Sequence, residues 1–159
     1  MGAFEHTIVD TAHGQIDPAQ ALAFVTDAEF GGYNLFVGRV RHTNHGRRVT
    51  GISYDMFDAL AQVHFEQAIA RAQADFGPQL RVWLAHAKGH LAVGDVAVVV
   101  AVGTVHRDAA FRACRQLIEE VKHRSPIWKQ EHYEDGSSEW SEGCSLCEDH
   151  EHGDDTSHA

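Results

Sequence analysis

Seven consecutive apolar residues, Val96 to Val102, restrict the fold of this 159-residue chain more than any other segment. A run of this length, rich in β-branched side chains, is typical of a central strand buried on both faces. A segment starting at about residue 107 then carries apolar side chains at helical spacing, and Pro126 ends it. These side chains are Phe111, Cys114, Leu117, Ile118 and Val121. A doubly buried strand followed by an amphipathic helix indicates a sheet with helices packed on it.

The rest of the chain alternates between strand and helix patterns. Strands are predicted at residues 7–9, 33–38, 49–57 and 80–87, with a loop at 43–48 and a turn at 89–95. One helix is predicted after Asp17-Pro18 and another over residues 58–76. The inward-facing residues of the second helix are expected to be Leu60, Val63, Ile69 and Ala72. This order predicts an α+β, two-layer α/β domain with a mixed, largely antiparallel sheet.

The charge is distributed unevenly between a body and a tail. The chain has 23 acidic side chains against 13 lysines and arginines, and every one of those cations precedes residue 131. The body is therefore close to neutral, which argues against a nucleic-acid partner. We expect a single domain over residues 1–140 and a disordered, acidic tail with cysteines and histidines over residues 141–159.

Other features bear on the compartment. No apolar run is long enough to cross a membrane, and the N-terminus lacks the pattern of a secretory signal. Three cysteines do not make a disulfide framework, so a reducing cytoplasm is expected.

Cationic residues occur in pairs near the predicted helix and strand ends. Lys122 and Lys129 flank Pro126, and Arg39 and Arg41 share a face if their strand continues. Arginine pairs suit bidentate contacts with phosphate, although solvated arginines at a strand end are the commoner case. His106-Arg107 lies where the central strand meets the helix, a place that favours anions, or is simply an ordinary helix start.

The tail offers a different chemistry. Cys144 and Cys147 form a Cys-x-x-Cys pair, and His150, His152 and His158 follow. Thiolates and imidazoles are zinc ligands, but one such pair is half of a usual site. Two interpretations stay open: an unstructured tail with incidental ligands, or a zinc site that would make the chain a non-enzymatic metal-binding or metal-sensing module.

The residues also occur in ordered blocks that resemble the catalytic (large) subunit family of molybdopterin synthase. The resemblance covers about residues 31–140. It rests on blocks at residues 36–46, 52–57, 90–95, 106–114 and 122–131, with a further match at 136–140. Five blocks in one order make the resemblance highly specific.

The resemblance implies an α/β hammerhead fold and a homodimer. Each large subunit is expected to bind a small, ubiquitin-like sulfur-carrier subunit, which gives a heterotetramer. The carrier's C-terminal Gly-Gly thiocarboxylate would enter the pocket and donate sulfur to cyclic pyranopterin monophosphate. Two rounds would form the dithiolene of molybdopterin, a step of molybdenum cofactor biosynthesis.

The resemblance also assigns roles to residues. Lys122 and Lys129 match the two active-site lysines, and the residues expected at the substrate site are Arg39, Val40, Arg41, His106, Arg107, Gln130 and Glu131. Fixed cations suit a substrate that carries a phosphate diester. Lys122 would act as an acid/base or covalently, and the sequence does not decide between these. No cofactor is required for catalysis, and zinc is expected only in the tail, at Cys144, Cys147, His150 and His152.

Overall fold

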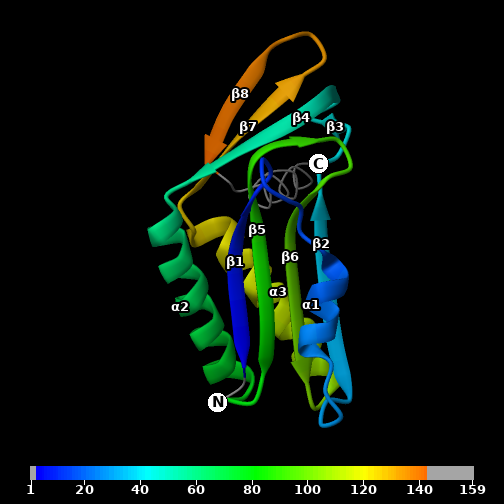
Figure 1. The fold of residues 1–159 in the computed structure, drawn as a ribbon, viewed down its shortest axis with the longest axis vertical. Coiled ribbons are helices and arrows are strands. Elements are labelled where there is room, and N and C mark those ends of the chain that lie inside the picture. The colour runs from blue at the N-terminus through cyan, green and yellow to red at the C-terminus, as the bar shows by residue number, and fades with distance from the viewer. Residues whose placement is uncertain (1–2, 143–159) are drawn as a thin grey trace, which may run out of the picture.

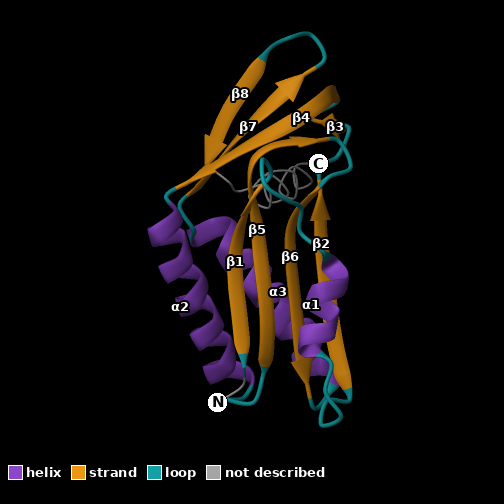
Figure 2. Cartoon of the chain, viewed as in Figure 1, coloured by secondary structure: helices purple, strands orange, loops and turns teal. Residues whose placement is uncertain are grey.

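A computed structural model describes residues 3–142, so the predicted zinc ligands of the tail lie outside the described residues. The strands are β1 (Phe4–Asp10), β2 (Gly32–Arg39), β3 (Thr43–Asn44), β4 (Arg47–Met56), β5 (Arg81–Ala92), β6 (Val96–Thr104), β7 (Ile127–Tyr133) and β8 (Ser138–Glu142). The helices are α1 (Pro18–Val25), α2 (Asp58–Phe76) and α3 (Arg107–Arg124). Figures 1 and 2 show their arrangement.

The eight strands form one mixed sheet in the order β2-β6-β5-β4-β7-β8. β1 pairs with β5 in parallel, β3 pairs with β4, and every pairing except β1–β5 is antiparallel. β6 lies between β2 and β5, and the residues from Val98 to Val102 are fully buried. The predicted α+β class, largely antiparallel sheet and doubly buried central strand are confirmed.

β5 joins two parts of the sheet. Its first half pairs with β1 and β6, and residues 89–92 pair with β4. Gly89 lies between the two halves with a φ of 103°, and a Cβ there would approach the Thr11 Oγ1 to 2.4 Å. The turn predicted at 89–95 was wrong at its start, because glycine allows the strand to bend and continue. The upper strands β4, β7 and β8 therefore cross the lower ones, as the head of a hammer does (Figure 1).

Helices cover both faces of the lower sheet. α3 packs against β6 and β2, α2 packs against α3 and β1, and α1 lies on β5 and β6 (Figure 1). Two expectations about helix faces were wrong: Leu60 and Val63 are 44% and 47% exposed, and Phe111 is 61% exposed. The buried stripe of α2 is instead built largely from alanines, together with Phe65 and Ile69.

The hairpin of β7 and β8 follows α3 and was not predicted. Ser125 ends α3 in an extended conformation, and β7 begins at Ile127 beside β4. Side chains of β7 alternate between a buried face and an outer face. This alternation directs Lys129, Glu131 and Tyr133 to the buried face. Within residues 3–142 no helix is long and apolar enough to cross a membrane.

Candidate active site

A cavity of about 390 Å³ opens where α3 ends, between the two parts of the sheet. Its lining combines apolar side chains with four lysine and arginine side chains. The lining residues include Phe36, Arg39, Arg41, Asn44, His45, Ile52, Tyr54, Ile118, Lys122, Lys129 and Glu131. They come from β2, the loop and hairpin of β3, β4, α3 and β7, segments that are far apart in the sequence.

Lys122 lies in the last turn of α3, whose other face is held in the core by Leu117 and Val121. Its Nζ is 5.5 Å from the centre of the Tyr54 ring. Burial, and then the positive charge of Lys129, lower the pKa of Lys122 to about 8. Both the ammonium and the free amine are therefore present near neutral pH, as acid/base or nucleophilic chemistry requires.

Lys129 is held differently, by a buried carboxylate. Its Nζ is 3.1 Å from the Glu131 Oε1, and the two side chains are 6% and 8% exposed. The Tyr133 hydroxyl donates to the Glu131 Oε2 at 2.8 Å, and the Asn44 amide donates to the same oxygen. Burial alone would raise the pKa of Glu131, but the bond from Tyr133, the charge of Lys129 and the bond from Asn44 together lower it. Glu131 is thus a buried carboxylate that pairs with Lys129.

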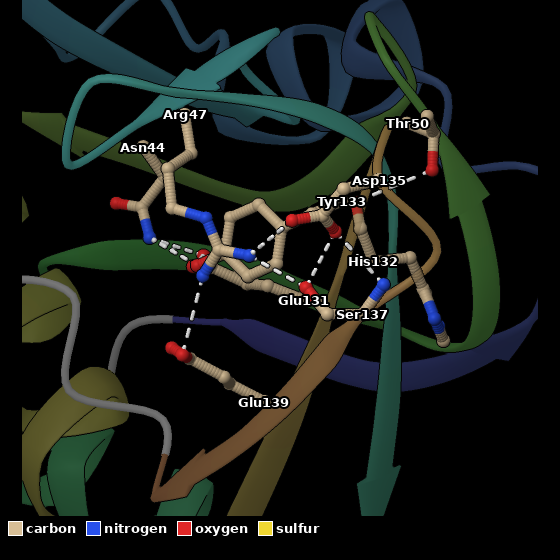
Figure 3. A network of polar contacts seen from close by, with 9 residues as sticks. All are labelled: Asn44, Arg47, Thr50, Glu131, His132, Tyr133, Asp135, Ser137 and Glu139. Carbon is tan, nitrogen blue, oxygen red and sulfur yellow. Dashed lines mark hydrogen bonds and ion pairs between the residues drawn. The ribbon is translucent and has the colours of Figure 1, made fainter.

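A polar network fixes the hairpin that carries Asn44. The guanidinium of Arg47 lies 3.6 Å from the centre of the Tyr133 ring and donates to Ser137, and it forms ion pairs with Asp135 and Glu139 (Figure 3). His45 and Gly46 form the turn between β3 and β4, both with positive φ. The predicted loop at residues 43–48 is therefore a tight hairpin braced against β7 and β8.

The arginines form the polar side of the cavity. The Arg39 Nε donates to the Gly94 carbonyl at 2.9 Å, which fixes one edge of its guanidinium. Arg41 is exposed and forms no ion pair with any residue of the described range. The cavity therefore presents four lysine and arginine side chains against one carboxylate. Such a surface is electrostatically suited to an anion.

Four of the predicted site residues do not line this cavity. Val40 is buried, and its amide donates to the Asp95 carbonyl. Gln130 lies on the outer face of β7, where its amide donates to Ser138. His106 and Arg107 are exposed at the start of α3, about 22 Å from Lys122 along the helix axis. One chain therefore brings together Arg39, Arg41, Lys122, Lys129 and Glu131, and leaves His106 and Arg107 at the opposite end.

Tyr54 and Asn44 are cavity residues of the predicted blocks that had been given no role. Tyr54 forms part of the wall beside Lys122, and burial and then the charge of Glu131 raise its pKa to about 12. Asn44 binds Glu131. Strand alternation over residues 49–57 was the available signal for Tyr54, because it shares a face with Ile52. Asn44 gave no signal beyond its turn chemistry.

A second hollow, of about 480 Å³, lies beside β1 and α1. It has no lysine or arginine among its lining residues. The cluster of cations therefore identifies the cavity at the end of α3 as the candidate active site.

The hammerhead-shaped fold and this site define a class: an α+β protein with a cavity that holds two lysines beside two arginines. Comparisons with known proteins identify the family. Residues 11–124 match the family model described as MoaE protein. The chain is 43% identical to the molybdopterin synthase catalytic subunit of Synechococcus elongatus, over 89% of this chain and 86% of the relative. The chain belongs to the family of molybdopterin synthase catalytic subunits.

Solved structures share the fold. Molybdopterin synthase from Staphylococcus aureus superposes with a TM-score of 0.77 at 30% identity, over 84% of this chain and 94% of the other. A chain from the complex of subunits 1 and 2 of molybdopterin-converting factor from Helicobacter pylori has a TM-score of 0.65 at 24% identity, over 86% and 89% of the two chains. The family and the enzyme class predicted from the sequence are confirmed.

Proposed function

We propose that this chain transfers sulfur from the thiocarboxylated C-terminus of a small carrier subunit to cyclic pyranopterin monophosphate. The observation that carries this proposal is the cavity itself, in which three other cations share the lining with Lys122, whose pKa lies near 8. The arginines would hold the phosphate, and fixed positive charge would stabilise the oxygen that leaves when the cyclic phosphate opens.

Lys122 and Lys129 take different parts in this proposal. Lys129 is paired with Glu131, so it serves as the fixed cation of the site. Lys122 has no carboxylate partner in the described range and is partly deprotonated at neutral pH. Lys122 is therefore the group that exchanges a proton or attacks a carbonyl carbon. The nucleophile that delivers sulfur is the carrier's own thiocarboxylate, so no cysteine of this chain is required. Cys114 is buried on α3, and burial raises its pKa to about 11.

The carrier would reach this site with its Gly-Gly tail extended into the cavity. The Helicobacter pylori relative is solved as a complex of two subunits, and its fold is that of this chain. We place the reaction in the cytoplasm, because three cysteines do not form a disulfide framework.

A homodimer would complete the site. β2 is an edge strand of the sheet, and it runs from the start of α3 to the cavity. At its first end a Cβ on Gly32 would lie 3.0 Å from the Arg107 Cα, and at its last end Arg39 lines the cavity. Antiparallel pairing of two β2 strands about a twofold axis would bring each Gly32 beside the other chain's Arg39. His106 and Arg107 of one chain would then border the cavity of the other.

The surface around β2 supports this arrangement. Tyr33 and Phe36 of β2 and Phe111 of α3 are large, apolar and exposed. Apolar side chains gathered at a strand edge are typical of an interface. Two such dimer subunits, each with a carrier, would form the expected heterotetramer.

Mixing two inactive variants tests both the activity and the shared site. Lys122→Ala and Arg107→Ala should each be strongly impaired in sulfur transfer. When the two are refolded together in equal amounts, half of the dimers are mixed and one of their two sites is intact. Activity should recover to about one quarter of the wild-type value. No recovery, with mixed dimers demonstrated, would refute the shared site, and an inactive wild-type chain would refute the activity.

A further inference from the structure

His86 is a fully buried histidine that lies behind the cavity wall, in the middle of β5. Its side chain is 0% exposed, and its Nδ1 is 2.8 Å from the Ala87 carbonyl oxygen. Because that oxygen only accepts, Nδ1 carries the proton and Nε2 is left as an acceptor. Within residues 3–142 nothing donates to the His86 Nε2. A buried acceptor without a donor is costly and calls for a physical explanation.

The neighbouring group that can account for the unpaired Nε2 of His86 is the amino group of Lys122. The Tyr54 ring contacts both residues: its centre is 4.9 Å from the centre of the His86 ring and 5.5 Å from the Lys122 Nζ. Burial, and then the positive charge of Lys122, lower the pKa of His86 to about 3. His86 therefore stays neutral at every pH at which Lys122 changes its charge.

The other charged groups near Lys122 come from three elements. β7 supplies Lys129, which lowers the pKa of Lys122, and Glu131, which forms its ion pair with Lys129. β4 supplies the Tyr54 hydroxyl, which stays protonated because its pKa is about 12. The arginines Arg39 and Arg41 line the same cavity from β2 and its following loop. Among these groups in the described range, His86 is the neutral acceptor that has no donor of its own.

We propose that His86 is a positioning residue for Lys122: its unprotonated Nε2 is the acceptor toward which the amino group of Lys122 is drawn. The proposal rests on the proposed function only in taking Lys122 as the reacting lysine. No hydrogen bond joins the two in this structure, so the attraction is between the ammonium charge and the lone pair of the imidazole. This attraction favours the ammonium form of Lys122, whereas burial and the charge of Lys129 favour its free amine. His86 thereby keeps a useful fraction of Lys122 protonated and holds its side chain against Tyr54.

Two substitutions at His86 separate this role from a structural one. In His86→Asn the amide nitrogen takes the place of Nδ1, so the bond to the Ala87 carbonyl is kept and the Nε2 acceptor is lost. In His86→Gln the amide oxygen takes the place of Nε2, so the acceptor is kept and the bond to Ala87 is lost. A purely structural histidine and a positioning histidine therefore rank these two variants in opposite orders.

The measurement is the pKa of Lys122 by NMR, on the full chain alone. The chain has three lysines, Lys88, Lys122 and Lys129, so ¹³C-labelled lysine gives three side-chain signals to follow with pH. His86→Asn should lower the Lys122 pKa by about half a unit or more, because an acceptor for the ammonium is removed. His86→Gln should leave it within about 0.2 units of the wild-type value, and Lys88 should not move in either variant.

Equal Lys122 pKa values in the two variants, or a fall in His86→Gln alone, would overturn the proposal. If either variant fails to fold, the wild-type chain still decides, because the ¹⁵N signal of the His86 Nε2 should shift as Lys122 titrates near pH 8. A flat signal through that range would also overturn it. The NMR samples contain neither the carrier nor the pterin, so these outcomes do not depend on whether the chain transfers sulfur.

Discussion

Glu131→Gln tests how the buried ion pair holds Lys129. The two side chains are 8% and 6% exposed and their charged atoms are 3.1 Å apart, so removing the carboxylate leaves a buried ammonium without its counter-charge. Breaking a buried pair on one side costs about 3–5 kcal/mol of folding free energy. Glutamine keeps the shape and can still accept from Tyr133 and Asn44, so we expect about 3 kcal/mol, the lower end of that range.

Thermal and urea unfolding at pH 7 measure this loss. For a chain of this size about 3 kcal/mol lowers the Tm by roughly 6–12 °C. Glu134→Gln is the matched control, because Glu134 and Arg48 are 3.7 Å apart and both 69% exposed. An exposed pair of that kind contributes less than about 1 kcal/mol.

The pH dependence gives a second reading of the same pair. Because the pKa of Glu131 is lowered in the folded chain, its contribution to stability is complete above its ordinary pKa of 4.5. That contribution is lost as the pH falls through the folded-state value. The stability gap between the wild type and Glu131→Gln should therefore narrow in acid. A gap below about 0.5 kcal/mol at pH 7, or one that does not change with pH, would refute this account of Lys129.

Three further results are expected. Arg41→Ala should weaken binding of cyclic pyranopterin monophosphate in calorimetry by about 1.5–3 kcal/mol, whereas Arg124→Ala, outside the cavity lining, should not; unchanged affinity would remove Arg41 from the phosphate site. A carrier that lacks its terminal Gly-Gly should bind much more weakly and give no product, and equal binding by calorimetry would contradict insertion of its tail. If the tail binds zinc, metal analysis should find about one zinc per chain that Cys144→Ser releases, and deletion of residues 143–159 should leave sulfur transfer intact; loss of activity on that deletion would put the tail inside the catalytic unit.

Much of the fold follows from sequence periodicity. The central strand and the bounds of α2 were predicted because a long apolar run and a helical repeat ended by Gly77-Pro78 are local signals. The burial of individual helix residues was harder to predict. Leu60 and Val63 were expected inside, yet α2 packs through small residues such as Ala61 and Ala68, which allow close approach to α3 and the sheet. Which stripe of a helix is buried depends on its partner, and the partner is not encoded locally.

The site divides along similar lines. Lys122 and Lys129 could be predicted from their position around Pro126 and from the family resemblance, and both lie in one cavity. The hairpin of β7 and β8 was missed because its two strands are short and rich in polar residues. The pairing of β7 with β4 depends on contacts that are distant in sequence. No sign of a functional role for His86 was present in the sequence, because one histidine in an apolar run is typical of a buried strand. Its neighbours Tyr54 and Lys122 come from other elements.

The most direct test of the central claim is single-turnover sulfur transfer with thiocarboxylated carrier and cyclic pyranopterin monophosphate. The wild-type chain should form molybdopterin, and Lys122→Ala should be slower by about 10²–10⁴-fold, the usual effect of losing one acid/base group. Lys88→Ala is the matched control, because Lys88 forms an ion pair with Asp58 and does not line the cavity. Product formation at the wild-type rate by folded Lys122→Ala would contradict the assignment of Lys122 as the reacting lysine.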